Sequence, residues 1–229
     1  MDSRLINGYK INAFSSKDDF LNRIISEKKI LVAMNAEKIL QDNDKLRDVV
    51  NDNIGYSDGV GAVIALKQDG LEAIKIPGSE FWLDIIDRFS NTKTFYLVGS
   101  STAVINSTVK RLKEEYSHIN IVGYRNGFLK NGDRERLVED LQNKKPDIVF
   151  VAQGSPKQEF LMSELIKEYQ ALYMGLGGSF DIYSGKKKRA PNLFLNYQLE
   201  WFYRLIKEPT RVKRQLVLVK FFILYVIFA

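Results

Sequence analysis

Three glycine-containing stretches of the sequence carry polar side chains of the kinds that perform chemistry. In the first, YSDGVG (56–61), Asp58 precedes Gly59 and a run with helical spacing. A carboxylate at a strand end, near helix amides and flanked by glycines, can take a proton from an attacking hydroxyl. An aspartate directly before a helix can equally serve as the helix N-cap. The stretch alone leaves both roles open for Asp58.

The second stretch, VAQGSPKQEF (151–160), has the pattern of a strand, a turn of small residues and a helix that begins near Pro156. Free backbone amides at the start of such a helix can hold a phosphate. The turn contains Gly154, and the side-chain amides of Gln153 and Gln158 could donate hydrogen bonds to a sugar or an oxyanion. The alternative is an ordinary strand-to-helix turn without a ligand.

The third stretch, GLGGSFDIYSGKKKRAP (175–191), brings Gly177 and Gly178 close to Asp181. Glycines let a backbone approach phosphates, and the aspartate could hold a ribose or a base. The glycine spacing is not a dinucleotide-binding fingerprint, because no acidic residue follows about twenty residues later at a second strand. The phosphate-binding loop of nucleoside triphosphatases is absent from the sequence as well.

The composition excludes several other kinds of site. The chain has no cysteine and one histidine, so it offers no disulfide, thiolate ligand or cysteine nucleophile. His118 lies between an expected helix and an expected strand, and we interpret it as structural. The DND segment (42–44) has the D-x-D spacing of metal-binding sugar transferases, but it does not follow a strand, so we interpret it as a solvated turn. We therefore expect no metal site.

The elements that position these stretches alternate along the chain. Apolar runs predict buried strands, and longer patterned segments between them predict helices. The expected strands are 30–35, 94–100, 119–124, 147–154 and 171–178, and the expected helices are 16–28, 59–69, 79–90, 101–117, 132–143 and 157–169. This order predicts an α/β fold, a Rossmann-like parallel sheet flanked by helices. Ligands of such sheets bind at the carboxyl ends of the strands, where the three stretches lie.

Charge separates the C-terminal end from the rest. After Gly185, ten basic residues accompany two acidic ones, so the last 44 residues carry a net charge of +8, while the first 185 residues carry −2. This asymmetry indicates an anionic partner at that end. We place a domain boundary between an α/β domain (1–190) and a helical appendage (191–229), near Pro191.

The apolar segment 216–229 would form a helix about 21 Å long, short of the roughly 30 Å hydrocarbon core of a bilayer. We expect the appendage to associate with a membrane by lying on the bilayer or inserting partly. Packing of this helix against the domain or a second subunit is the alternative. The N-terminus lacks the apolar region of a secretory signal.

Eight segments in the same order together resemble one family. They are NAEKIL (35–40), SDGVG (57–61), KIPGSEF (75–81), YLVGSS (96–101), GYRNGF (123–128), GSPKQE (154–159), GLGGSFDIYSGKKKRAP (175–191) and LEWFYRLIKEPTRVKRQ (199–215). These segments are similar to those of the WecG/TagA/CpsF glycosyltransferases of bacterial surface-polysaccharide synthesis.

The resemblance implies a transferase at the cytoplasmic face of the bacterial cell membrane. It would move a hexose of the N-acetylmannosamine type, or a related one, from a UDP-sugar with inversion and without an evident metal or other cofactor. The acceptor would be a sugar on a polyprenyl diphosphate lipid, used in capsule, teichoic acid or exopolysaccharide synthesis. The partners would be these two substrates and an anionic membrane surface, without nucleic acid; a homo-oligomer is left open.

The resemblance also assigns residues. Asp58 falls on the proposed base of the family, and Asn35, Lys75 and Gln158 fall on further catalytic positions. We expect the nucleotide to contact Gly99, Ser100, Tyr124, Asn126, Gly154, Gly177, Gly178 and Asp181, with Arg204, Arg211 and Arg214 on diphosphate groups. Two departures, Ala33 for a frequent threonine and Lys75 for a frequent arginine, affect the identity of the sugars more than the reaction class.

Two other classes of function are weighed against this one. A nucleotide-dependent oxidoreductase could use a similar sheet, but the acidic residue for the ribose and a catalytic histidine or Tyr-Lys set are missing. A non-enzymatic module that binds nucleic acid or membrane would fit the pI near 9.3. Nucleic-acid binding, however, needs basic residues spread along a face of the domain, whereas here they are confined to the last fifth of the chain.

Overall fold

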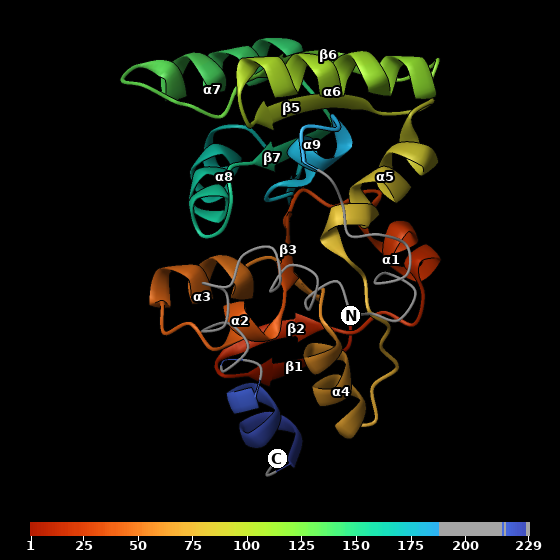
Figure 1. The fold of residues 1–229 in the computed structure, drawn as a ribbon, viewed down its shortest axis with the longest axis vertical. Coiled ribbons are helices and arrows are strands. Elements are labelled where there is room, and N and C mark those ends of the chain that lie inside the picture. Colours follow the sequence, from red (N-terminus) through yellow and green to blue (C-terminus); the bar gives the residue numbers. More distant parts are fainter. Residues whose placement is uncertain (188–216, 218, 228–229) are drawn as a thin grey trace.

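An eight-stranded sheet divides the helices of the described chain into two layers (Figure 1). The computed structural model describes residues 1–187, 217 and 219–227. The strands are β1 (Ser3–Ile6), β2 (Tyr9–Asn12), β3 (Ile30–Met34), β4 (Ile54–Ser57), β5 (Thr94–Gly99), β6 (Asn120–Arg125), β7 (Ile148–Ala152) and β8 (Leu172–Gly175). Their order in the sheet is β1-β2-β4-β3-β8-β7-β5-β6.

The sheet is mostly parallel, which confirms the predicted Rossmann-like α/β class. Every pairing from β2 to β6 is parallel, and only the hairpin partner β1 is antiparallel. β1, β2, β4 and β3 form a first half of the sheet, and β8, β7, β5 and β6 form a second half. The pairing of β3 with β8, in which Ile30 lies opposite Tyr173, joins the two halves. The carboxyl ends of the parallel strands therefore meet along one edge.

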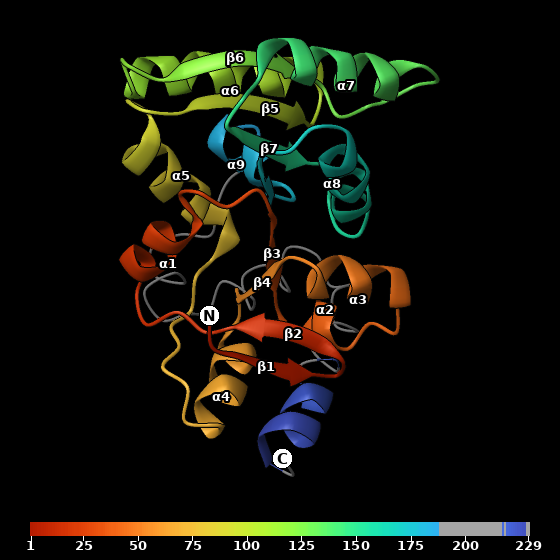
Figure 2. The same cartoon turned by 180° about the vertical axis from the view of Figure 1, so that it is seen from behind.

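The helices fill both faces of this sheet (Figure 2). They are α1 (Lys17–Ile24), α2 (Ala36–Ile39), α3 (Asp44–Asn51), α4 (Val60–Gln68), α5 (Gly78–Phe89), α6 (Thr102–Glu115), α7 (Asp133–Lys144), α8 (Lys157–Glu168) and α9 (Ser179–Tyr183). Apolar residues of α2, α3, α4, α7 and α8 pack on one face. Those of α1, α5, α6 and α9 pack on the other.

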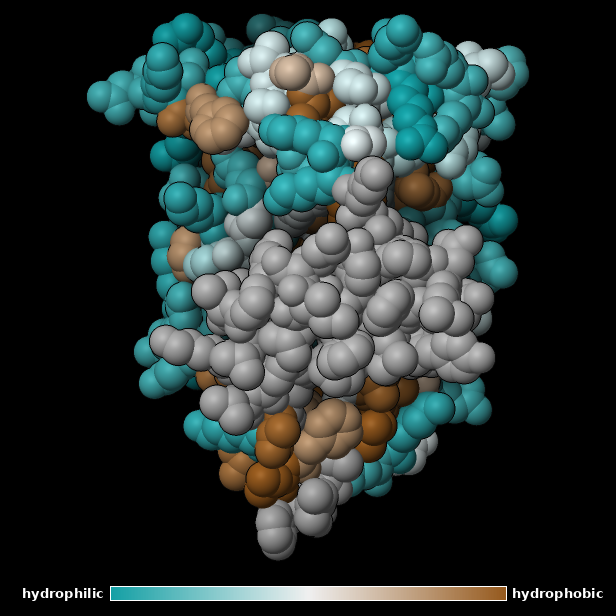
Figure 3. Space-filling view, in the orientation of Figure 1, coloured by the Kyte–Doolittle hydropathy of each residue, from teal (hydrophilic) through white to brown (hydrophobic). Residues whose placement is uncertain are grey.

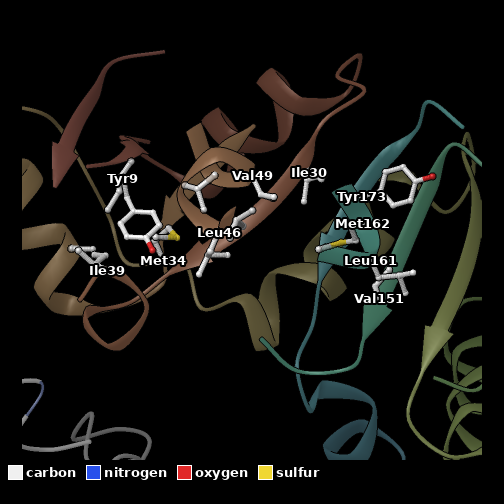
Figure 4. Close-up of a cluster of buried hydrophobic side chains, with 14 of the residues drawn as sticks. Tyr9, Ile30, Met34, Ile39, Leu46, Val49, Val151, Leu161, Met162 and Tyr173 are labelled. Carbon is white, nitrogen blue, oxygen red and sulfur yellow. The ribbon is translucent and has the colours of Figure 1, made fainter. Parts of the chain in front are cut away.

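The alternation of strand residues explains the two layers. Val149 and Val151 of β7 join the first core cluster, whereas Ile148 and Phe150 of the same strand join the second. Successive side chains of a strand point to opposite faces, so an entirely apolar strand serves both cores. The first cluster continues across both halves of the sheet, from Tyr9 to residues of β7, β8 and α8 (Figure 4). The two halves of the sheet therefore share this first core cluster.

Local sequence sets several of the helix starts. Ser16, Asn35, Asn43 and Ser101 each accept a hydrogen bond from the backbone amide three residues ahead, as N-cap residues do. Asn43 lies in the DND segment, where α3 begins at Asp44 and no strand precedes it. Asn35 follows β3 directly and Ser101 follows β5 after one residue, so two of these caps lie at the carboxyl edge of the sheet.

The C-terminal helix (residues 219–227, π-helical over Ile223–Ile227) packs against α4. Phe221 is fully buried and lies over Gly61, where a Cβ atom would come within 2.8 Å of the phenylalanine ring. Val219, Ile223 and Leu224 remain exposed. Figure 3 shows apolar surface at the lower end of the molecule, where the C-terminal helix lies in Figure 1. No helix among the described residues is long and apolar enough to cross a membrane. The predicted boundary at residue 190 lies outside the described residues.

Candidate active site

Asp58 is half-buried at the carboxyl end of β4. It lies between the end of β3 and the start of α5. Its backbone amide donates to the carbonyl of Met34 at the end of β3, at 3.0 Å. Its Oδ1 accepts a hydrogen bond of 2.8 Å from the amide of Gly78, the first residue of α5. The N-cap of α4 is Gly59, so Asp58 does not cap the helix that follows it. Instead, its carboxylate is held at the start of a helix distant in sequence.

Tyr56 lies close to this carboxylate, inside the protein. Its side chain is fully buried, and its hydroxyl has no hydrogen-bond partner among the described residues. A Cβ atom on Gly78 would lie 2.8 Å from that hydroxyl and 3.9 Å from Asp58 Oδ1, so the three groups are close together. Burial raises the pKa of Tyr56 well above its ordinary value, and the charges of Asp58 and Glu159 add to the effect. Tyr56 therefore remains neutral beside the aspartate.

Asn35 lies beside the Asp58 turn. Its side-chain oxygen accepts a hydrogen bond of 3.0 Å from the amide of Lys38 and so caps α2. A Cβ atom on Gly59 would lie 3.4 Å from the Cβ of Asn35, so these two strand-end turns are in contact distance. The side-chain nitrogen of Asn35 is left for other partners. Two of the predicted catalytic residues, Asn35 and Asp58, are thus brought together by the pairing of β3 with β4.

A second group of polar residues gathers at the ends of β5 and β7. Ser100 has a left-handed backbone conformation, with φ of 51°, and its amide donates to the carbonyl of Ala152. Its hydroxyl donates to Asp181 Oδ2 at 3.2 Å. The preceding Gly99 has φ of 156°, and a Cβ atom there would lie 2.5 Å from the Ala152 oxygen. Only glycine fits at this point, where β5 approaches β7 closely.

The turn after β6 is fastened to this group. The amide of Gly127 donates to the Ser100 carbonyl at 2.9 Å, and the Gly127 carbonyl accepts from Gln153 Nε2 at 2.6 Å. The side-chain nitrogen of Asn126 donates a hydrogen bond of 3.2 Å to the Thr102 hydroxyl. The polar side chains of this edge hold one another in place, which gives the turns after β5, β6 and β7 a fixed geometry.

Gln158 lies inside the protein rather than on this edge. Its side chain is buried, its Oε1 accepts from the amide of Gly177 at 2.8 Å, and its Nε2 donates to Glu159 Oε1 at 3.3 Å. Its described role is to fasten the turn after β8. Gly177 has φ of 57°, and no described atom lies within 4 Å of where its Cβ would be. No described atom lies within 4 Å of a Cβ at Gly154 or Gly178 either, so the described residues leave space beside the backbone of these turns.

The remaining predicted residues are placed apart or are not described. Lys75 is exposed, between Ile74 and Ile76, whose amides donate to the carbonyls of Phe14 and Ser57. Tyr124 lies on the edge strand β6 with 44% of its surface exposed. Arg204, Arg211 and Arg214 lie outside the described residues. The described residues contain no group of three or more acidic or histidine side chains suited to a metal ion.

Sequence reasoning missed three residues that organise this edge. They are Tyr56, Gly78 and Lys38, and Lys38 forms a buried ion pair with Glu159. Lys38 and Glu159 lie within two of the eight family-like segments, but nothing in their spacing indicates that they meet across 121 positions. Gly78 follows a proline at a predicted helix start, a signal of turn geometry but not of contact with Asp58.

The fold defines a class, the Rossmann-like α/β proteins, whose ligands generally bind at the carboxyl ends of the parallel strands. A comparison with family models narrows the class. The model of the glycosyl transferase WecG/TagA/CpsF family matches residues 4–229, nearly the whole chain, and the protein belongs to this family. It is a glycosyltransferase, an enzyme with a sugar donor and an acceptor. Membership decides against the oxidoreductase and against the non-enzymatic module.

Proposed function

We propose that this glycosyltransferase moves a hexose from a UDP-sugar to a sugar carried on a polyprenyl diphosphate, with inversion at the anomeric carbon. The hexose would be of the N-acetylmannosamine type or a related one, and the product would enter capsule, teichoic acid or exopolysaccharide synthesis. The observation that carries the proposal is the placement of Asp58. Its Oδ1 is fixed by the Gly78 amide at a strand end, in contact distance of the Asn35 turn.

In the proposed mechanism, the acceptor hydroxyl donates its proton to Asp58 as its oxygen attacks the anomeric carbon. The new glycosidic bond forms on the face opposite the leaving group, and the bond from the anomeric carbon to the UDP oxygen breaks. A hydrogen bond from the Gly78 amide orients the carboxylate without neutralising it, so it remains able to accept a proton.

The donor would lie over the second half of the sheet. The space that the described residues leave beside Gly154, Gly177 and Gly178, together with Ser100 and Asp181, supports this placement of the nucleotide. The leaving diphosphate develops negative charge, which backbone amides and arginines can stabilise without a metal ion. We assign this role to Arg211 and Arg214, with Arg204 beside them, and the lipid diphosphate is the second anion that they could bind.

The acceptor would reach this edge from the inner face of the cytoplasmic membrane. The net charge of +8 in the last 44 residues and the exposed apolar side chains Val219, Ile223 and Leu224 support a peripheral or partly inserted attachment.

Replacing Asp58 with asparagine tests the proposal. The asparagine oxygen can still accept from the Gly78 amide, so the fold and the affinity for UDP should be retained. Transfer should fall by roughly 10²- to 10⁴-fold, the usual contribution of a general base. The measurements are product formation by mass spectrometry, UDP binding by calorimetry and the melting temperature. Near wild-type turnover would refute the assignment of Asp58.

The exposed Asp18 of α1 provides a matched control, because Asp18→Asn makes the same chemical change away from the strand ends. A panel of UDP-sugars with a synthetic polyprenyl-diphosphate glycan identifies the donor. Product mass gives the sugar transferred, and the anomeric configuration of the product shows whether the reaction inverts.

A further inference from the structure

A buried ion pair joins the two halves of the sheet. Lys38 Nζ of α2 lies 2.7 Å from Glu159 Oε1 of α8, and the two side chains are only 8% and 1% exposed. Burying an ion pair removes two charges from water, and its stability gain is often no greater than that of an apolar pair of the same size. Stability alone is therefore a weak reason for these two residues to be charged.

The contacts of this pair lead to the turns of the candidate active site. Glu159 Oε1 also accepts from Gln158 Nε2 at 3.3 Å, and Gln158 Oε1 accepts from the Gly177 amide at 2.8 Å. On the other side, the Lys38 amide donates to Asn35 at 3.0 Å. A continuous chain of contacts thus runs from the turn after β3 to the turn after β8.

Within this series of hydrogen bonds, the side-chain amide of Gln158 is the group that could adopt two orientations. A glutamine side chain can rotate so that its oxygen and nitrogen exchange places. In the orientation seen here, the oxygen faces the Gly177 amide and the nitrogen faces Glu159. The exchanged orientation would place an NH₂ group against the Gly177 N–H, with two donors facing each other. The carboxylate of Glu159 can only accept, so it requires the nitrogen of Gln158 on its side. The oxygen of Gln158 then faces the Gly177 amide.

We propose that Glu159 is a positioning residue for the transferase reaction. By accepting from Gln158 it directs Oε1 of that glutamine to Gly177, and so fixes the turn that leads to Gly178 and Asp181. Lys38 holds Glu159 in place and links it to the turn that carries Asn35. The proposal rests on the proposed function, because that turn is where the nucleotide of the donor would bind.

Two double variants separate positioning from packing. Both remove the ion pair and leave neutral side chains of similar size: Lys38→Met with Glu159→Gln keeps an acceptor for Gln158, and Lys38→Met with Glu159→Leu deletes it. The other carboxylate oxygen, Glu159 Oε2, has no partner within the described residues, so changing it to an amide group breaks no described hydrogen bond. The half-buried pair Lys17 and Asp84, 2.6 Å apart between α1 and α5, supplies the control double variant Lys17→Met with Asp84→Asn.

The first measurement is hydrogen exchange at the Gly177 amide, which needs no knowledge of the substrate. We expect the acceptor-deleting pair to lose protection at Gly177 by about tenfold or more, whereas the acceptor-keeping pair retains it. The second set comprises the affinity for UDP and kcat and KM for transfer. The acceptor-deleting pair should bind UDP about tenfold more weakly and lower kcat/KM by about 10- to 100-fold relative to the acceptor-keeping pair.

Equal behaviour of the two double variants at Gly177 would overturn the proposal, whether both match the wild type or both lose protection. A difference at Gly177 without any difference in UDP affinity or kcat/KM would also overturn it, because the turn would then be fixed for packing alone. If the wild-type protein bound no UDP, the proposed donor would be wrong, and the exchange result at Gly177 would still decide the positioning role. The Lys17–Asp84 control should match the wild type in every measurement.

Discussion

Gly78 begins α5 with its amide donated to Asp58 and leaves no room for a side chain. The Tyr56 hydroxyl and the Ala33 methyl group would lie 2.8 Å and 3.2 Å from a Cβ at this position. Both neighbours belong to central strands, so neither can move without disturbing the sheet. The start of α5 and the orientation of the proposed base therefore depend on one missing methyl group.

We predict that Gly78→Ala destabilises the protein by roughly 1–3 kcal/mol, the usual cost of overpacking, and lowers transfer at least tenfold. The double variant Gly78→Ala with Tyr56→Phe should recover much of the stability, because it removes the hydroxyl that the new methyl group meets. Thermal unfolding and initial rates check both statements. A single variant as stable as the wild type would contradict the close contact, and Ser79→Ala, one residue further, serves as the control.

Asp147 makes stability depend on pH. It accepts hydrogen bonds of 2.8 Å from the Thr94 amide and hydroxyl, which tie the start of β5 to β7. Partial burial raises the pKa of Asp147, but the hydrogen bonds from Thr94 and the charge of Lys93 outweigh it, so the pKa lies below the ordinary value. A depressed pKa in the folded state stabilises the protein above the ordinary pKa near 4, and the gain disappears as the pH falls through the folded value.

We therefore expect Asp147→Asn to lower the melting temperature at pH 7 and to have a smaller effect at pH 3. The measurement is a series of thermal unfolding curves between pH 3 and pH 7 for the wild type and the variant. A constant difference at every pH would show that the carboxylate charge is not involved.

At the level of secondary structure, the sequence predicts the long apolar strands and misses the short polar ones. Each of the five predicted strands is present: four are shorter by one to four residues, and β6 keeps the predicted length but is shifted by one residue. The hairpin of β1 and β2 was missed although Asn7 and Gly8, both with positive φ, form the Asn-Gly turn typical of hairpins. β4 was missed because four residues that include Gly55 and Ser57 give too little apolar pattern to detect.

The candidate site follows the same rule. The resemblance to the family assigns Asp58 and Asn35, although the strand that precedes Asp58 is too short and polar to be predicted from the sequence. The burial of Gln158 could not be predicted, since it depends on how α8 meets β8. The contact between Lys38 and Glu159 could not either, because it joins helices from opposite halves of the sheet.

The C-terminal helix packs against the domain, which was one of the two roles that the sequence left open, and it also leaves apolar side chains exposed. Phe221 is buried on α4, and Leu224 is 45% exposed. Removal of residues 216–229 should cost membrane attachment, whereas a cut after Lys207 should also cost catalysis because it removes Arg211 and Arg214. Because Phe221 fills a space over Gly61, we now expect the shorter cut to reduce stability as well.

Two point variants separate these effects. Phe221→Ala should destabilise the protein by about 3 kcal/mol, as the loss of a buried aromatic ring does. Leu224→Ala should leave stability nearly unchanged and weaken binding to lipid vesicles. Denaturant titration and vesicle sedimentation give the two results. If Phe221→Ala instead reduced vesicle binding and left the stability unchanged, Phe221 would be exposed and the helix would not pack on α4.

For the whole molecule, the dominant electrostatic feature is the separation of charge between a nearly neutral body and a C-terminal end of +8. A surface of this kind is attracted to anionic headgroups, and salt screens the attraction within about 10 Å at 0.1 M ionic strength. In the proposed attachment, the exposed apolar side chains of the C-terminal helix would add a contribution that salt does not weaken. Attachment should therefore have a salt-sensitive and a salt-resistant part.

We predict strong binding to vesicles that contain phosphatidylglycerol, weak binding to pure phosphatidylcholine, and partial release from the anionic vesicles at 0.5 M salt. Co-sedimentation measures all three. Equal binding to both kinds of vesicle would mean that charge does not direct the attachment, and full release by salt would exclude an apolar contribution.

The hairpin of β1 and β2 also decides how the protein should be handled. Arg4 of β1 pairs with Asp69 just after α4, and the C-terminal helix packs on that same α4, beside β1 in both views of the ribbon (Figures 1 and 2). The C-terminal helix and β1 beside it therefore lie at the lower end of the molecule in both views, the end proposed to meet lipid, whereas the N-terminus lies nearer the middle. An affinity tag or fluorescent protein fused to the C-terminus would crowd the lower end, so a reporter group is better attached to the outer side of α7, at the opposite end.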